Sequence, residues 1–78
     1  MGHAPTTEQV TAALKRAQDA ARELTPHPDR LLRHPLRPPE RIDERWWLIG
    51  HIRVLGQPEG WQVLYDPETD QGRLQAKR

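Results

Sequence analysis

The apolar residues of this chain change their spacing once, and that change limits the folds available to it. Between Val10 and Leu24 they recur every three or four positions, as on one face of an α-helix. From Trp46 onward they recur at every second position, as on one face of a β-strand. We therefore expect one helix followed by a sheet. In a chain of 78 residues, the two share one small core.

The helix is expected over residues 7–24. Thr6 and Gln9 have the spacing of a capping box, in which each side chain bonds the other residue's backbone N–H. Thr25-Pro26 ends the helix, because a proline disfavours the helical conformation of the residue before it. The apolar stripe is rich in alanine, which predicts close packing on a sheet: Val10, Ala13, Leu14, Ala17, Ala21 and Leu24.

Three strands are expected over residues 46–55, 61–66 and 72–77. They are joined by the segments GQPEG and DPETDQG, which have the composition of turns. The register of each hairpin is predicted by setting apolar residues opposite apolar residues or glycines. The predicted pairs are Val54–Trp61, Ile52–Val63, Gly50–Tyr65, Val63–Leu74, Tyr65–Gly72 and Trp61–Ala76.

Residues 25–44 are expected to form an ordered connector without a long regular element. They contain five of the eight prolines, each of which lacks a backbone donor. We expect short turns only, one from Pro28 through Arg33 and one from Pro39 that buries Ile42. The predicted fold class is α+β: a single domain over residues 1–78, with an N-terminal helix packed on a three-stranded antiparallel β-meander (αβββ) within residues 46–77.

The two faces of the predicted sheet differ in what covers them. The helix is expected to cover one face: Leu48, Ile52, Val54, Trp61, Val63, Tyr65 and Leu74. The second face carries an apolar group, Trp47, Ile49 and Leu64, with a largely polar rim: His51, Arg53, Leu55, Gln62, Arg73 and Gln75. A tryptophan with arginine around it is typical of protein interfaces. Alternatively, the connector folds over this face through Leu31, Leu32, Leu36 and Ile42 and completes the core.

The sequence thus predicts a small non-enzymatic protein-binding module. The expected partner is another protein or a second copy of the chain, contacted through Trp47, Ile49, His51, Arg53, Leu64 and Arg73. A secondary contact is expected from Arg30, Arg33, His34 and Arg37. Ten arginines against two lysines, with no serine, asparagine or phenylalanine, are typical of a high-GC bacterial or phage genome. An inhibitor encoded by a phage or mobile element is one concrete form of this hypothesis.

A nucleic-acid-binding domain is the main alternative. Trp47 would stack on a base, and the segment Arg30–Arg37 would contact phosphates. Against this, the 12 basic and 11 acidic residues are balanced along the chain, whereas nucleic-acid-binding proteins usually concentrate their basic charge. A ribonuclease-type toxin is the second alternative, with His51, Arg53 and Arg73 as its acid–base groups. In the predicted register, no carboxylate joins them.

No cofactor and no metal site are expected. The chain has neither cysteine nor serine, so the usual thiol and hydroxyl nucleophiles are absent. His27 and His34 lie seven residues apart between prolines, which is not a zinc-binding spacing. The lack of cysteine, of a secretory leader and of an apolar run of membrane-spanning length predicts a cytoplasmic protein.

Overall fold

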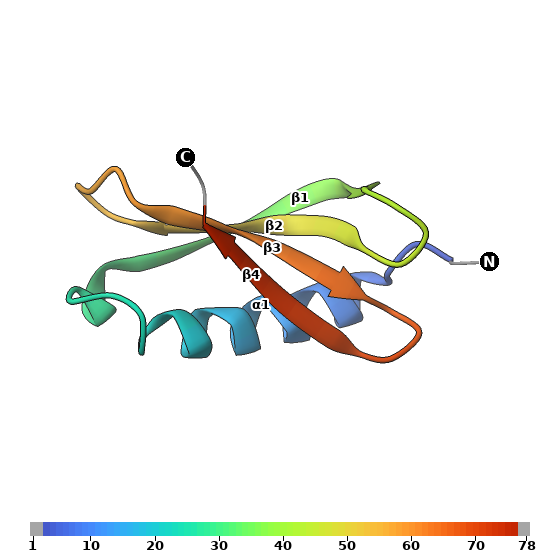
Figure 1. The fold of residues 1–78 in the computed structure, drawn as a ribbon, viewed down its shortest axis with the longest axis horizontal. Coiled ribbons are helices and arrows are strands. Elements are labelled where there is room, and N and C mark those ends of the chain that lie inside the picture. Colours follow the sequence, from blue (N-terminus) through green and yellow to red (C-terminus); the bar gives the residue numbers. More distant parts are fainter. Residues whose placement is uncertain (1–2, 77–78) are drawn as a thin grey trace.

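The structure is a computed structural model that describes residues 3–76. One helix packs on one face of a four-stranded antiparallel sheet, whose strands follow one another in sequence order (Figure 1). The elements are α1 (Thr7–Ala21), the 3-10 turn η1 (Pro28–Arg30), β1 (Leu31–Arg41), β2 (Trp47–Val54), β3 (Gly60–Asp66) and β4 (Gln71–Ala76). The α+β class is confirmed, but the prediction of three strands is wrong.

The additional strand, β1, occupies most of the segment predicted to be a connector. Prolines disfavour a central strand, yet an edge strand tolerates them because half of its backbone N–H groups point away from the sheet. β1 pairs regularly with β2 as far as Pro35, shifts register, and resumes at Glu40. The shifted stretch contains Pro38 and Pro39, and the Arg37–Pro38 peptide bond is cis. The segment therefore extends the sheet at its edge and does not cover the second face.

Of two further predictions for this segment, one is confirmed in part and the other is wrong. The short turn expected at Pro28 is present as η1, although it ends at Arg30 and not at Arg33. The turn expected at Pro39 is absent, since Pro39 and Glu40 belong to β1. Ile42, predicted to be buried there, is 50% exposed.

Helix α1 begins at the predicted capping box. The Thr6 hydroxyl accepts from the Gln9 N–H at 3.1 Å, and the Gln9 side-chain oxygen accepts from the Thr6 N–H at 2.9 Å. The helix ends at Ala21, three residues before the predicted end, and Leu24 is exposed. Its buried face is otherwise as predicted: Val10, Ala13, Leu14, Ala17 and Ala21. The short alanine side chains let the helix lie close to the strands.

A bulge in β2 decides which side chains of the stretch WWLIG face α1. The pairs across β2 and β3 are Trp47–Tyr65, Leu48–Leu64 and then Gly50–Val63. Ile49 is therefore an extra residue in β2 with no counterpart in β3. Because side chains alternate along a strand, one extra residue reverses which positions face inward. Odd-numbered residues face α1 before the bulge, and even-numbered residues face it afterwards.

The bulge contradicts the predicted faces of three residues. Trp47 and Ile49, expected on the uncovered face, belong to the core beside α1, and Ile49 is fully buried. Leu48, expected in that core, pairs with Leu64 on the opposite face. The predicted β2–β3 register is wrong as well, since Ile52 pairs with Trp61.

The predicted β3–β4 register is confirmed by the pairs Val63–Leu74, Tyr65–Gly72 and Trp61–Ala76. Residues 71–76 form this strand, and Lys77, the last residue of the predicted strand, lies outside the described residues.

Replacing Ile49 with valine tests its burial. Removing one buried methylene from a packed site destabilises a protein by about 1 kcal/mol. We expect urea unfolding to show a loss of that size for Ile49→Val. The control is Leu55→Ala, because Leu55 is 53% exposed and exposed substitutions usually change stability by less than about 0.5 kcal/mol. An Ile49→Val protein as stable as the wild type would contradict the bulged arrangement.

Candidate functional site

The sheet face opposite α1, called the open face below, is covered by no other helix or strand within residues 3–76. Figure 1 shows α1 on a single side of the sheet. The strand register places the side chains of the open face in rows across the strands. They are Leu32, His34, Glu40, Leu48, His51, Arg53, Gln62, Leu64, Asp66, Gln71, Arg73 and Gln75, with Trp46 just before β2. His51, Arg53, Leu64 and Arg73 thus lie on the predicted face, whereas Trp47 and Ile49 do not.

The centre of the open face is apolar, although its residues differ from those predicted. Leu48 pairs with Leu64, and Leu64 pairs with Arg73. The two leucines are only 8% and 7% exposed. Trp46 is half-buried beside them, with the Arg45 and Arg73 guanidinium carbons 4.7 Å and 5.9 Å from its ring centroid. At these distances the ring attracts both cations. Trp46 and Leu48 therefore take the places predicted for Trp47 and Ile49.

The turn between β1 and β2 holds the backbone at Trp46. One carboxylate oxygen of Asp43 accepts from the N–H groups of Arg45 and Trp46, each at 2.8 Å. The Ile42 N–H donates to the Trp46 carbonyl at 2.9 Å. The bonds from the two backbone N–H groups lower the pKa of Asp43. This turn therefore fixes where the Trp46 ring enters the open face.

Arg45 connects this turn to the one between β3 and β4. Its Nε donates to Asp66 at 2.7 Å, and it also donates to the side chain of Gln71. The Asp66 carboxylate is almost fully buried and also accepts from the Glu68 N–H and the Thr69 hydroxyl. The bond from Arg45 is the main cause that lowers the pKa of Asp66.

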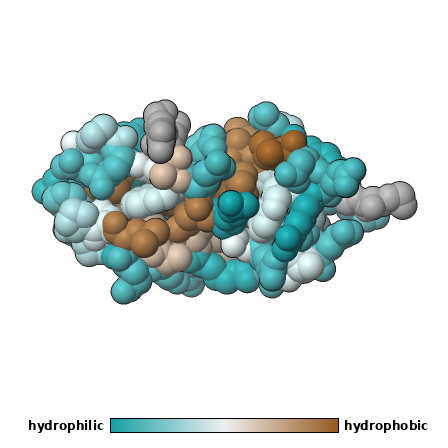
Figure 2. All heavy atoms as spheres, viewed as in Figure 1, coloured by the Kyte–Doolittle hydropathy of each residue, from teal (hydrophilic) through white to brown (hydrophobic). Residues whose placement is uncertain are grey.

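The open face carries more arginines than acidic residues. Arg45 is neutralised by Asp66, whereas Arg53 and Arg73 form no ion pair within residues 3–76. Beside them, His34, His51, Gln62 and Gln75 form one polar row across all four strands. Figure 2, in the view of Figure 1 in which both α1 and the strands are visible, shows apolar residues interrupted by polar side chains. The face thus combines an apolar centre with cations and hydrogen-bonding groups.

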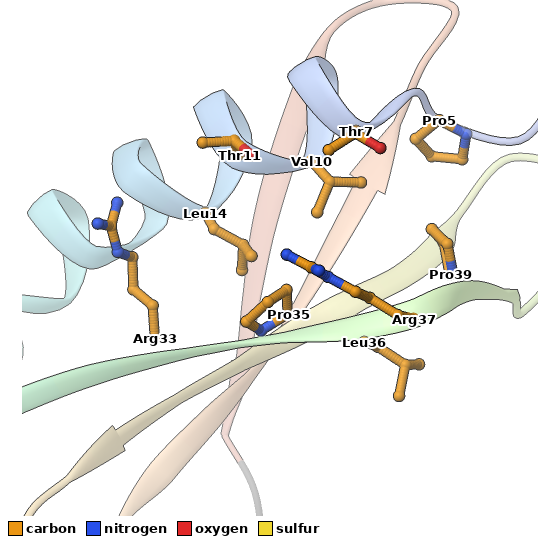
Figure 3. A pocket seen from close by; sticks show the side chains of 10 residues that line it. All are labelled: Pro5, Thr7, Val10, Thr11, Leu14, Arg33, Pro35, Leu36, Arg37 and Pro39. Carbon is orange, nitrogen blue, oxygen red and sulfur yellow. The ribbon is translucent and has the colours of Figure 1, made fainter.

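The residues predicted as a secondary contact are divided between different parts of the molecule. His34 lies on the open face, and Arg30 belongs to η1. Arg33 and Arg37 line a groove between α1 and β1, of about 360 Å³ (Figure 3). The segment Arg30–Arg37 is therefore not one continuous basic loop, because alternate residues of a strand face opposite sides of the sheet.

A third polar cluster joins α1 to the β3–β4 turn. The Arg16 guanidinium donates to both oxygens of Asp70, at 2.9 Å and 3.3 Å, and the Tyr65 hydroxyl donates to the same carboxylate at 2.5 Å. Burial raises the pKa of Tyr65, and the bond from Tyr65 lowers that of Asp70. Sequence patterns gave no sign of this contact, since 54 residues separate Arg16 from Asp70. We assign it a structural role.

The described residues contain no group of three or more His, Cys, Asp or Glu placed to hold a metal ion. Among residues 3–76, no helix is both long and apolar enough to cross a membrane.

The lowered pKa of Asp66 predicts a loss of stability in acid. A carboxylate with a folded-state pKa below its unfolded value stabilises the fold above the unfolded pKa, and this contribution disappears as pH falls through the folded pKa. We expect Asp66→Asn to be less stable at pH 7 and to lose less stability between pH 5 and pH 2 in urea titrations. Asp29→Asn is the control, because the Asp29 side chain bonds no other described residue. If Asp66→Asn and the wild type lose stability in parallel, the Arg45–Asp66 contact is not formed.

Comparison of this chain with protein-family models, with curated proteins and with solved structures found no match.

Proposed function

We propose that this chain is a small non-enzymatic protein-binding module that acts through its open face. The half-buried Trp46 beside the buried pair Leu48 and Leu64, on a sheet face that no other helix or strand of residues 3–76 covers, carries the proposal. Tryptophan and arginine dominate the binding energy of protein interfaces, and a polar rim usually surrounds them. The row of histidines and glutamines beside this centre has the character of such a rim.

The cations on the open face indicate the chemistry of the partner. Arg53 and Arg73 have no carboxylate partner within residues 3–76. A guanidinium binds a carboxylate through two parallel hydrogen bonds, which also fixes orientation. The proposed partner therefore presents an apolar side chain to Trp46 and acidic side chains to the two arginines. It is another protein or a second copy of this chain, and the solution mass of the isolated protein distinguishes the two.

Single-stranded nucleic acid is the second candidate, because the open face leans positive and carries one tryptophan. Stacking requires an accessible ring face. The ring of Trp46 already has the Arg45 guanidinium 4.7 Å from its centroid, and Asp66 and Gln71 hold that arginine in place. A base would have to displace it. The formal net charge of +1 also provides little general attraction for phosphates.

Site-specific photocrosslinking tests the proposed function. A benzophenone side chain at Gln75, on the open face, is expected to crosslink to a protein in extracts of cells that naturally make this chain. The same probe at Lys15, an exposed residue of α1, is the matched control and is expected to give no such adduct. Trp46→Ala and, separately, Arg73→Ala should remain folded by circular dichroism and should lose the Gln75 adduct.

Two results would contradict the proposal. An adduct that disappears on nuclease treatment, with binding to a labelled oligothymidine that weakens linearly in log–log plots against salt, would establish the nucleic-acid alternative. A protein adduct that persists in both folded variants would show that the Trp46 centre is not the contact.

A further inference from the structure

The groove between α1 and β1 has the size and walls of a small-molecule site. Its volume of about 360 Å³ falls within the range of roughly 300–1,000 Å³ typical of ligand pockets. Val10 and Leu14 line it from α1, and Pro35 lines it from β1 (Figure 3). Leu36 also borders it, although Figure 3 shows its side chain turned away from the helix. An apolar body would fit between the helix and the strand.

Two exposed arginines border this groove without a counterion. Figure 3 shows the Arg33 side chain rising from β1 toward α1, and the Arg37 guanidinium lying between Pro35 and the helix. Neither arginine forms a hydrogen bond or ion pair through its side chain within residues 3–76. The residues that line the groove include no aspartate or glutamate. The groove is therefore electrostatically complementary to an anion.

The remaining polar groups of the groove suit the same kind of ligand. Thr7 and Thr11 line it from α1, and each hydroxyl is able to donate to an oxygen of an anion. A guanidinium group binds a planar carboxylate through two parallel hydrogen bonds. We propose that the groove between α1 and β1 binds a small carboxylic acid with an aliphatic or aromatic body. The apolar part lies against Val10, Leu14 and Pro35, and the guanidinium groups that border the groove, Arg33 and Arg37, bind the carboxylate.

This proposal does not depend on the function proposed for the open face. The groove lies on the α1 side of the sheet, so its ligand does not contact Trp46 or the side chains beside it. Variants of the groove and variants of the open face therefore test separate claims.

Titration of the ¹⁵N-labelled protein with octanoate, followed by amide NMR shifts, is the first part of the test. We expect saturable shifts at residues 7–14 and 33–37. Octanamide has the same chain without the charge and should bind at least about tenfold more weakly, which corresponds to roughly 1.4 kcal/mol. Acetate, which lacks the apolar body, should give no saturable shift at the same concentrations. Absence of octanoate binding, equal affinities for octanoate and octanamide, or shifts at other residues would each overturn the proposal.

Variants provide the second part of the test. Arg33→Gln and Arg37→Gln are each expected to weaken octanoate binding, and the double variant is expected to abolish it. Arg30→Gln is the matched control, because Arg30 is an exposed arginine of η1 that does not line the groove. Thr11→Phe should also block binding by filling the groove from the helix side. Full octanoate affinity in the double variant would overturn the assignment of the carboxylate to these arginines.

Discussion

The bulge at Ile49 is the constraint on which both surfaces of this sheet depend. Without it, a continuous strand would present Trp47 and Ile49 on the face opposite Ile52 and Val54. With it, all four side chains join the core beside α1. The same reversal brings Leu48 to the open face, next to Leu64. A single extra residue thus places Trp47 and Ile49 in the core and the apolar pair Leu48 and Leu64 on the open face.

Turn residues give the open face its tryptophan ring and the arginine beside that ring, whereas Arg53 and Arg73 come from strands. Asp43 fixes the backbone at Trp46, and Asp66 holds Arg45 beside the ring. Both carboxylates accept from backbone N–H groups of their turns, and that of Asp66 also binds the Arg45 guanidinium. The arrangement is established before any partner arrives, which reduces the conformational entropy lost on binding. Such preorganisation supports a binding role for this face.

Local sequence patterns were sufficient to predict part of the fold. The capping box at Thr6 and the apolar stripe of α1 depend on neighbours within one turn, and the β3–β4 pairing follows from a single hairpin. β1 was missed because its prolines outweighed any strand pattern, although an edge strand accommodates them. The bulge did leave a signal, since Trp46, Trp47, Leu48 and Ile49 are all apolar and break the alternation of a regular strand. Continuous alternation was assumed instead, and the predicted binding residues Trp47 and Ile49 followed from that assumption.

The two surfaces use the arginines of this chain differently. On the open face the arginines surround a tryptophan and two leucines, whereas Arg33 and Arg37 border an apolar groove on the side of α1. Both assignments require the observed pairing of β2, because that pairing decides which residues of β1 and β3 share a face. Cross-strand NOEs between backbone protons measure this pairing directly. The account predicts contacts of Gly50 with Val63 and of Ile52 with Trp61, whereas contacts of Gly50 with Tyr65 and of Ile52 with Val63 would contradict it.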